Sequence, residues 1–369
     1  MYSQLSISFD MVNISPTVQK VKSINLPNIR IKSDRFHLQN RRFLGNKYKL
    51  LGFIEEIVRT NCDHIGVFCD IFAGTGVVGE RFNKKTNKVI SNDLLASNYI
   101  PLITFLGTKR INYTTLEQKI NYLNNLNPSD ENYFSKHFGN TYFTLDNARK
   151  IGAIREKIDE ISEDDDKYIL ITSLLYAVDK VANTVGHYDA YRKILDTTQT
   201  IRLLVPEVKI ENNENNEIYQ EDANLLIRKI NCDVLYIDPP YNSRQYSDAY
   251  HLVENLVTWK KPQVYGKAKK MDRSHIKSVY CLKSATQAFA DLISHANCRD
   301  ILVSYNNTGE SKHGRSNARI NDKQIINILE RRGKVKIFER EYKAFTAGKS
   351  KSNGHMERVF YCKVTKKRI

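Results

Sequence analysis

Long apolar runs are missing from this chain of 369 residues. The longest, residues 169–175, is interrupted by Thr172 and Ser173, whereas a membrane-spanning helix needs about 20 apolar residues. The first residues, MYSQLSISFDMVNISP, contain neither a basic start nor an apolar block, so we expect no secretory signal. These absences predict a cytoplasmic protein that has no contact with a membrane.

Paired cysteines are also missing. The six cysteines form no C-x-x-C pair, and no histidine stands at zinc-finger spacing from them. In a chain of this length they are expected to be free thiols in a reducing compartment, most of them small buried side chains. We therefore expect no metal site.

Two familiar glycine patterns are incomplete. Val77 stands where the third glycine of a dinucleotide-binding fingerprint would fall, and no G-K-[ST] occurs, which excludes a P-loop. An acid, an aromatic residue and two glycines remain in the segment from Asp70 through Phe72 and Gly74 to Gly76. Glycine lets the backbone approach a ligand closely, although such a pair often marks only a tight turn.

Positive charge is abundant. Lysine and arginine number 57 against 41 acidic residues, which gives a formal net charge of +16. This excess favours a polyanionic partner, nucleic acid first. A basic protein without such a partner is the alternative.

Apolar strands alternate with amphipathic helices along much of the chain. This alternation predicts an α/β fold with a mostly parallel sheet and crossover helices, followed by a C-terminal antiparallel hairpin. The strands are expected at residues 66–72, 88–91, 218–222, 233–237 and 301–305, and the hairpin at 334–342 and 358–365. The helices are expected at residues 47–60, 77–82, 168–183, 223–230, 249–259 and 324–331.

The predicted sheet is interrupted. Residues 98–216 are rich in asparagine, carry helical periodicity and are too many for a loop, so we expect a separate, mainly helical inserted subdomain. The catalytic domain would then comprise residues 34–97 and 217–369, and residues 1–33 would form an irregular N-terminal arm.

Polar turn-forming clusters follow three of the predicted strands. They are Gly74-Thr75-Gly76, Asn92-Asp93 and the segment Asp238-Pro239-Pro240-Tyr241. In parallel sheets, ligands bind beyond the carboxyl ends of the strands, so these clusters should meet in one crevice. An acid such as Asp93 can accept hydrogen bonds from ribose hydroxyls, although Asn-Asp also occurs in plain solvated turns.

The segment from Asp238 to Tyr241 carries the strongest chemical signal. Two consecutive prolines cannot continue a central strand, so they project a carboxylate and a ring beyond the sheet. The carboxylate and a neighbouring carbonyl can accept hydrogen bonds from an amino group, and the tyrosine offers a flat surface for a base drawn out of a duplex. An ordinary β-turn is disfavoured because the apolar approach from Val234 to Ile237 places the turn at the edge of the sheet.

Three motifs in order resemble one enzyme family. The glycine segment FAGTG, the later DPPY and the upstream FLGNKYKLL, residues 43–51, are similar to the motifs of the D-twelve class of adenine-specific DNA methyltransferases. The resemblance spans residues 41–365, with the insert as target-recognition subdomain. It implies a Rossmann-like methyltransferase fold, S-adenosylmethionine as cofactor and double-stranded DNA as substrate.

The resemblance also implies roles for individual residues. Asp238, Pro239, Pro240 and Tyr241 would hold an extruded adenine, and its 6-amino group would receive the methyl group directly from the sulfonium, with no metal. The cofactor would be bound by Gly45, Asn46, Lys47, Asp70, Phe72, Gly74, Gly76, Asp93 and Asp222. A separately encoded restriction endonuclease is the partner that such a methyltransferase implies.

DNA contacts are predicted at two basic segments. Arg244, Tyr246 and His251 follow the catalytic turn, and Lys349 and Lys351 lie in the basic loop of the terminal hairpin. A solvated surface is the competing interpretation for both segments.

Two other functions stay open at this point. The same motifs occur in enzymes that methylate the 4-amino group of cytosine, or amino groups in RNA or protein glutamine. A non-catalytic DNA-binding specificity subunit is the second alternative, although it would not need an intact DPPY.

Overall fold

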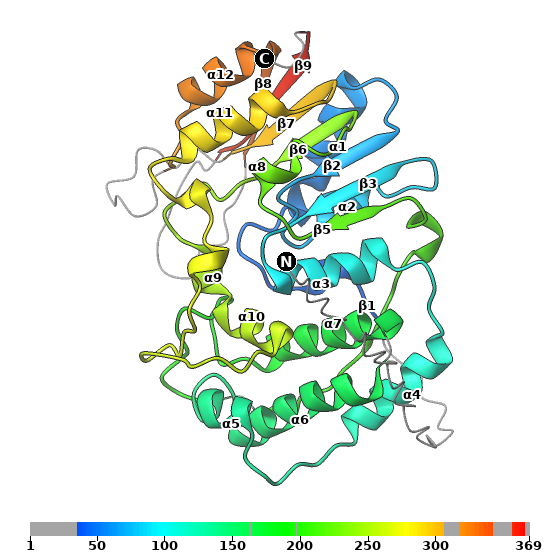
Figure 1. Ribbon diagram of the computed structural model, residues 1–369, viewed down its shortest axis with the longest axis vertical. Helices are drawn as coiled ribbons and strands as arrows, with labels where there is room; N and C mark the ends of the chain where they lie inside the picture. Colours follow the sequence, from blue (N-terminus) through cyan, green and yellow to red (C-terminus); the bar gives the residue numbers. More distant parts are fainter. Residues whose placement is uncertain (1–34, 163, 197, 306–317, 342–355, 366–369) are drawn as a thin grey trace, which may run out of the picture.

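A seven-stranded sheet, covered by helices on both faces, forms one half of the molecule, and a layer of helices forms the other (Figure 1). The computed structural model describes residues 35–162, 164–196, 198–305, 318–341 and 356–365. The expected N-terminal arm and both Lys349 and Lys351 lie outside the described residues.

Five neighbouring strands of the sheet are parallel, and the last two continue it as an antiparallel hairpin. The order is β5-β3-β2-β6-β7-β9-β8, with β9 antiparallel to both of its neighbours. The strands are β2 (Val67–Asp70), β3 (Lys88–Asn92), β5 (Glu217–Tyr219), β6 (Val234–Ile237), β7 (Asp300–Ser304), β8 (Gly333–Glu341) and β9 (Met356–Val364).

This arrangement confirms the predicted sheet and its terminal hairpin. The largest difference is in β5, which ends at Tyr219 rather than at residue 222. Asp222 is therefore not the end of a strand: it is the N-cap of the short helix α8 (Ala223–Leu226). A further pair of parallel strands, β1 (Arg35–Phe36) and β4 (Val205–Pro206), lies apart from the main sheet.

The strand order changes direction at β2. The chain passes from β2 to β3 and β5 on one side, and then returns to β6 and β7 on the other. The crossovers consequently leave a crevice beyond the carboxyl ends of β2 and β6, where α/β sheets bind ligands.

Helices cover the two faces of the sheet through separate apolar cores. On one face α1 (Leu51–Asn61) and α2 (Val77–Phe82) pack on Phe68 and Tyr236. On the other, α8, α11 (Ala285–His295) and α12 (Asp322–Glu330) pack on Leu235 and Ile301. The predicted amphipathic helix at 47–60 is confirmed as α1, after a 3₁₀ turn at Tyr48–Leu50.

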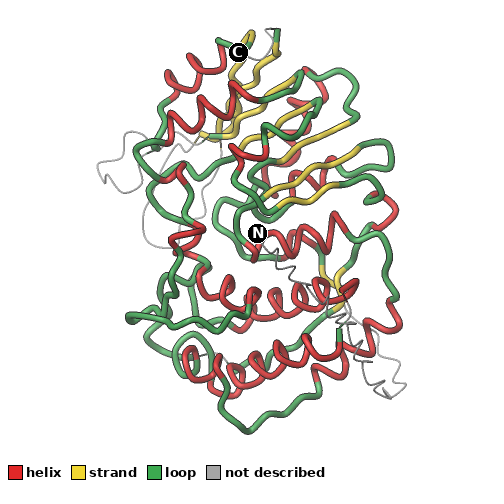
Figure 2. Tube along the Cα trace, in the orientation of Figure 1, coloured by secondary structure: helices red, strands yellow, loops and turns green. Residues whose placement is uncertain are grey.

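The helical layer has its own core. Its members are α3 (Ala96–Leu102), α4 (Tyr113–Asn124), α5 (Tyr133–Phe138), α6 (Leu145–Ile161), α7 (Asp164–Val181) and α10 (His251–Thr258). Figure 2 shows these helices as a layer below the strands. No helix in the described part of the chain is long and apolar enough to cross a membrane.

The helical layer differs in two respects from the sequence prediction. The predicted helix at 249–259 is confirmed as α10, but it begins only at His251, because the chain breaks at Tyr250 after a separate short helix, α9 (Tyr246–Ala249). In addition, α10 packs into the same core as the segment 98–216. The layer is thus not built from that segment alone, and the subdomain boundaries stay a prediction.

Candidate active site

The carboxyl ends of β2, β3 and β6 open into one pocket with about 1020 Å³ of space, its open mouth included. Thirteen of the residues predicted for the site line this pocket: Gly45, Asn46, Lys47, Asp70, Phe72, Gly74, Asp93, Asp222, Asp238, Pro239, Pro240, Tyr241 and Tyr246. The expected meeting of three polar strand ends is confirmed.

The turn after β2 requires glycine at two positions. Gly74 has a φ of 54° and Gly76 a φ of 82°, both in the left-handed region that favours glycine. Gly74 lines the pocket, but Gly76 does not. A Cβ on Gly76 would lie 2.5 Å from Leu102, so this glycine serves the packing of α2 against α3.

The end of β3 is joined to its neighbours by a buried amide. The side chain of Asn92 donates to the carbonyls of Ile71 and Glu221 and accepts from the amide of Glu221. Asp93, which follows it, accepts hydrogen bonds from the amides of Gly74 and Leu95, each at 2.9 Å. These bonds fix the Asp93 carboxylate beside the glycine turn.

A lysine lies between two carboxylates at the end of β6. Lys47 Nζ is 2.9 Å from Asp238 Oδ2, 3.0 Å from Asp238 Oδ1 and 3.5 Å from Glu357 Oε1. Burial alone would lower the pKa of Lys47, but Asp238 and Glu357 outweigh it and hold that pKa well above its ordinary value. Residues 47, 238 and 357 thus form one charged cluster.

Burial raises the pKa of Asp238 to about 6, and the neighbouring Lys47 limits the rise. The side chain of Asp238 is 18% exposed, so it remains accessible from the pocket. Its carboxylate is therefore mostly ionised at neutral pH and can accept a hydrogen bond from a group that enters.

Asp70 is the least satisfied polar group of the site. It is 1% exposed, and neither of its carboxylate oxygens has a hydrogen bond with the described residues. Burial and then the charge of Asp238 raise the pKa of Asp70 to about 8, although the nearby Gly79 amide opposes the rise. The two buried oxygens of Asp70 thus have no hydrogen-bond partner in the described part of the chain, and with this pKa Asp70 is mostly protonated at neutral pH.

The segment that carries Lys47 is held by a stack of three rings. Phe43 is nearly parallel to Tyr250 and Tyr246, at centroid distances of 4.5 and 5.3 Å, and the two tyrosine rings are 6.2 Å apart. Tyr250 Oη accepts from the Leu44 amide at 2.6 Å, and Tyr246 Oη donates to the Leu44 carbonyl at 3.3 Å. The rings connect the motif near the start of the chain to the helices that follow DPPY.

The tyrosine of DPPY is fixed through its backbone. Its carbonyl accepts from Tyr305 Oη at 3.2 Å and from the Arg319 amide at 2.8 Å. The rings of Tyr241 and Tyr305 meet edge to face, at 6.4 Å. One side of the Tyr241 ring is therefore supported while the residue lines the pocket.

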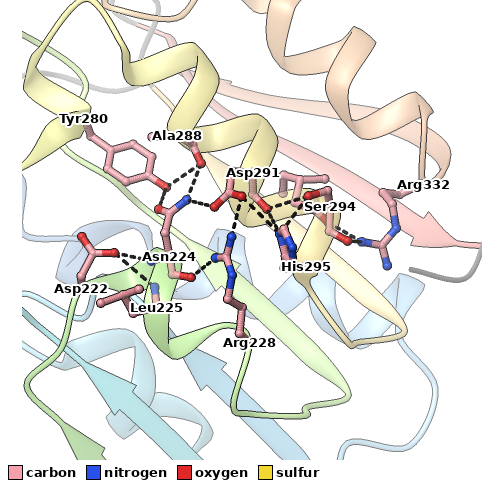
Figure 3. Close-up of polar contacts among 11 residues, drawn as sticks. Asp222, Asn224, Leu225, Arg228, Tyr280, Ala288, Asp291, Ser294, His295 and Arg332 are labelled. Atoms are coloured by element: carbon pink, nitrogen blue, oxygen red, sulfur yellow. Dashed lines mark hydrogen bonds and ion pairs between the residues drawn. The ribbon is translucent and has the colours of Figure 1, made fainter. Parts of the chain in front are cut away.

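Asp222 lies at the opposite wall of the pocket, next to a network between α8 and α11 (Figure 3). Its side chain accepts from the amides of Asn224 and Leu225 and so caps α8. Asn224 in turn accepts from Tyr280 Oη at 2.8 Å and donates to Asp291. This network holds the ring of Tyr280 in the pocket wall, where it meets Phe72 edge to face.

The residues predicted to contact DNA after the catalytic turn differ in position. Tyr246 lines the pocket, whereas Arg244 lies outside it, with its side chain 52% exposed and near Asp189. The interpretation of His251 as a DNA contact is wrong: it is 1% exposed, and its Nε2 is bonded to the Tyr188 carbonyl.

Sequence reasoning missed Glu357, which does not line the pocket but contacts Lys47 and accepts from Ser304 Oγ at 3.1 Å. The predicted strand 358–365 begins one residue after Glu357, so no sequence signal marked this acid. Among the described residues, no group of three or more His, Cys, Asp or Glu side chains is placed to hold a metal ion.

Comparison with known proteins agrees with this geometry. Residues 43–307 match the family described as D12 class N6 adenine-specific DNA methyltransferase. The match begins in the segment that carries Lys47 and extends past β7, so it includes the glycine turn and DPPY.

Individual relatives are type II methyltransferases. The chain is 33% identical to type II methyltransferase M.NlaIII of Neisseria lactamica, over 85% of this chain and 95% of that protein. It is 38% identical to type II methyltransferase M.FokI of Planomicrobium okeanokoites, over 73% of this chain and 45% of that protein. It is 34% identical to modification methylase StsI of Streptococcus sanguinis, over 78% of this chain and 46% of that protein. The chain thus matches nearly all of the first relative and slightly under half of the other two.

Proposed function

This chain belongs to the D12 class of N6 adenine-specific DNA methyltransferases, and on that premise we propose that it methylates the 6-amino group of an adenine extruded from duplex DNA. One observation carries the proposal. Asp238, Pro239 and Tyr241 at the end of β6 share a pocket with the glycine turn after β2.

The pocket fits S-adenosylmethionine as the methyl donor. Asp70 has two buried oxygens without a hydrogen bond to the described residues, and an ammonium group of such a molecule would lower the raised pKa of Asp70 and favour its carboxylate form. Gly74 leaves room for close approach, and Asp93 is fixed where a ribose could be bound. Gly45, Asn46, Lys47, Phe72 and Asp222 would complete the binding site, while Gly76 would act only through the turn.

The chain's own groups would activate the amino nitrogen. The lone pair of that nitrogen is delocalised into the purine ring, so it is a weak nucleophile. Hydrogen bonds from its two hydrogens to the Asp238 carboxylate and the Pro239 carbonyl would favour a tetrahedral nitrogen with a localised lone pair. When bound, S-adenosylmethionine supplies a methyl group already activated by the sulfonium. Positioning and electrostatics would then provide most of the rate.

Tyr241 would receive the extruded base. Removing a base from the stack costs a few kcal/mol, and stacking on an aromatic ring offsets part of that cost. The contacts of Tyr241 with Tyr305 support this role, because a ring with a fixed backbone and a supported edge loses little entropy on binding. Tyr246, on the adjoining wall, would close over the base.

The remaining surface would select and hold the DNA. We assign target recognition to the helical layer formed mainly by residues 98–216, and phosphate contacts to Arg244, Lys349 and Lys351. The names of the relatives, which include type II and modification methyltransferases, support a role in a restriction–modification system with a separate endonuclease.

The proposal is tested by the product and by one residue. Purified protein, duplex DNA and S-adenosylmethionine should give N6-methyladenine, as identified by mass spectrometry of the digested DNA. N4-methylcytosine as the sole product would contradict the adenine assignment.

Asp238→Ala should lower the single-turnover methylation rate by at least ~10²-fold, since an acceptor for the developing charge is lost. Asp238→Asn keeps the shape of the side chain but removes its charge, so this variant should methylate DNA nearly as slowly as Asp238→Ala. Calorimetric binding of S-adenosylmethionine should survive in both variants. Normal methylation by Asp238→Ala would exclude the proposed mechanism.

A further inference from the structure

A lysine-rich hairpin, residues 260–277, leaves the helical layer after α10 and returns to the rim of the pocket. It contains seven lysine and arginine residues and one acid, Asp272, so these 18 residues carry a formal charge of +6 out of the +16 of the chain. In Figure 1 its yellow ribbon projects to the left of α10. The hairpin is separate in the chain from the glycine turn, from DPPY and from the segment around Lys47.

The hairpin has a defined backbone. Tyr265 and Lys270 face each other across two backbone hydrogen bonds of 2.8 and 3.0 Å. The turn between them contains Gly266 at a φ of 69° and Lys269 at a φ of 51°. A lysine in the left-handed region is strained, and such strain persists only where the surroundings impose it.

Two tyrosines of the helical layer contact one arm and the turn of the hairpin. The partly buried Tyr133 donates through Oη to the Pro262 carbonyl at 2.6 Å. The Oη of the buried Tyr142 is 2.8 Å from the Tyr188 carbonyl and 3.1 Å from the Ala268 carbonyl, and shares its one hydroxyl proton between them. Lys270 is also paired with Asp189 at 2.9 Å. The hairpin is therefore presented as a preformed element, and little ordering entropy would be lost if a partner bound it.

Three of its seven cations form ion pairs. Lys270 and Arg273, at the base, pair with Asp189 and Asp248, and Lys261 pairs with Glu156. Lys260, Lys267 and Lys277 are exposed and form no ion pair with any described residue. Positive charge without acidic neighbours is what a phosphate-binding surface requires.

Helix α5 extends this positive surface. Burial, and then the charges of Lys136 and Lys269, lower the pKa of His137. The cations of the hairpin and of α5 are thus close enough to affect one another.

The hairpin ends at the pocket. Ile276 and Ser278 both line it, and the exposed Lys277 stands between them in the chain. Met271 and Ile276 pack on Leu95, which follows Asp93 and lines the same pocket. A duplex that delivers a base to Tyr241 would have its backbone next to these lysines.

We propose that the hairpin 260–277 is a DNA-binding element that contacts the phosphates flanking the extruded base. The inference rests on the proposed function and adds the surface that holds the duplex. Lys260, Lys267 and Lys277 would supply the contacts, and the paired cations at the base would fix their geometry.

The test compares two triple variants of equal charge. In one, Lys260, Lys267 and Lys277 are replaced by glutamine. In the control, the exposed Lys84, Lys85 and Lys334 are replaced in the same way. These three lie before β3 and at the start of β8, at the amino edge of the sheet and away from the pocket.

Duplex affinity is measured over a series of salt concentrations. Each phosphate contact contributes about 0.9 to the slope of log K against log salt. The hairpin variant should have a slope smaller by about 2 to 3 and an affinity at least ~10-fold weaker at 0.1 M salt. The control should keep the wild-type slope, and both should bind S-adenosylmethionine normally.

Equal slopes for the two triple variants would overturn the inference, as would a wild-type chain that does not bind duplex at all. If the wild-type protein binds duplex but forms no methylated base, the proposed reaction fails, and the slopes still decide the role of the hairpin.

Discussion

The charge cluster around Asp238 sets the protonation chemistry of the pocket. Lys47 contacts both Asp238 and Glu357, so its ammonium can remain paired with Glu357 when the Asp238 carboxylate accepts hydrogen bonds from a substrate. Glu357 is in turn held by Ser304. This arrangement keeps a cation near the catalytic carboxylate without making that carboxylate unavailable.

The pH dependence of the reaction should report this cluster. In the proposed mechanism the ionised form of Asp238 is the active one, so the rate should fall as the pH decreases through about 6. Lys47→Met removes the cation that lowers the pKa of Asp238. The acidic limb of the pH–rate profile should therefore move to higher pH. Once the pKa of Asp238 exceeds 7, each further increase of one in that pKa should slow the reaction at pH 7 by roughly 10-fold. Single-turnover rates between about pH 5 and 9 measure the limb.

Lys47→Arg is the matched control, since it retains the positive charge and should leave the limb near pH 6. An unchanged limb in Lys47→Met would show that the cation does not set the pKa of Asp238.

Single residues could be predicted where a local motif was available. The sequence indicated Asp93 and Asp238, because the residue type, the turn residues and the end of a predicted strand coincided, whereas Lys47 was indicated by the resemblance of residues 43–51 to a family motif. Glu357 was not predictable, because its partner Lys47 is 310 positions away in the chain and only the tertiary fold brings them together. Gly76 had the expected conformation, but its contact with Leu102 depends on packing between helices.

At the scale of elements, the β2–α2 turn joins the ligand pocket to the core. Gly76 is the N-cap of α2 and directly faces the buried Leu102 of α3. The conformation of the turn and the packing of two helices therefore depend on the same residue.

Gly76→Ala should lower the free energy of unfolding by roughly 2–5 kcal/mol. About 1–2 kcal/mol comes from the left-handed backbone and about 1–3 kcal/mol from overpacking against Leu102. Gly266→Ala separates the two contributions, since Gly266 has a φ of 69° but nothing within 4 Å of its Cβ position. Urea denaturation of both variants makes the comparison, and equal losses would contradict the packing contribution.

Elements with a clear period could be predicted, and irregular ones could not. The short apolar strands and α12 were found because their burial follows the sequence pattern. The break at Tyr250 was not found, since the ring of Tyr250 stacks on Phe43, a contact that no local pattern contains. The shortening of α8 to Ala223–Leu226 and the position of α11 were missed for a similar reason, as tertiary packing decides them.

At the scale of the whole molecule, α3 connects the sheet half to the helical half. It follows Asp93 at the end of β3, and Figure 1 shows it between the sheet and α7. Its Ala96 and Ile100 belong to the core of the helical layer, whereas Leu102 belongs to the core between the sheet and helices α1 and α2. Glu254 of α10 accepts from the amides of Ala96 and Ser97, at 2.8 and 2.9 Å, and so caps α3 from a neighbouring helix of the same layer.

Glu254→Gln should therefore destabilise the protein by roughly 1–3 kcal/mol, because one buried amide would face a donor rather than an acceptor. Glu156→Gln is the control, as it alters an exposed ion pair with Lys261 and should cost below about 1 kcal/mol. Urea denaturation measures the free energy of unfolding of both variants, and similar decreases would contradict the capping role of Glu254.

Domain boundaries were the least predictable feature at this scale. The composition of residues 98–216 indicates a helical segment, but the core of the helical layer also recruits Leu252, Val253 and Leu256 from beyond the catalytic turn. The apolar residues of α10 would show the same sequence pattern in either core, so the sequence alone cannot assign them to one of the two cores.

The charged cluster draws on Lys47 before the first strand of the main sheet, Asp238 in the middle of the chain and Glu357 in β9. During synthesis on the ribosome, this cluster cannot be completed until β9 has emerged and taken its place between β7 and β8. A chain truncated before β9 would lack Glu357, so Lys47 would be paired with Asp238 alone.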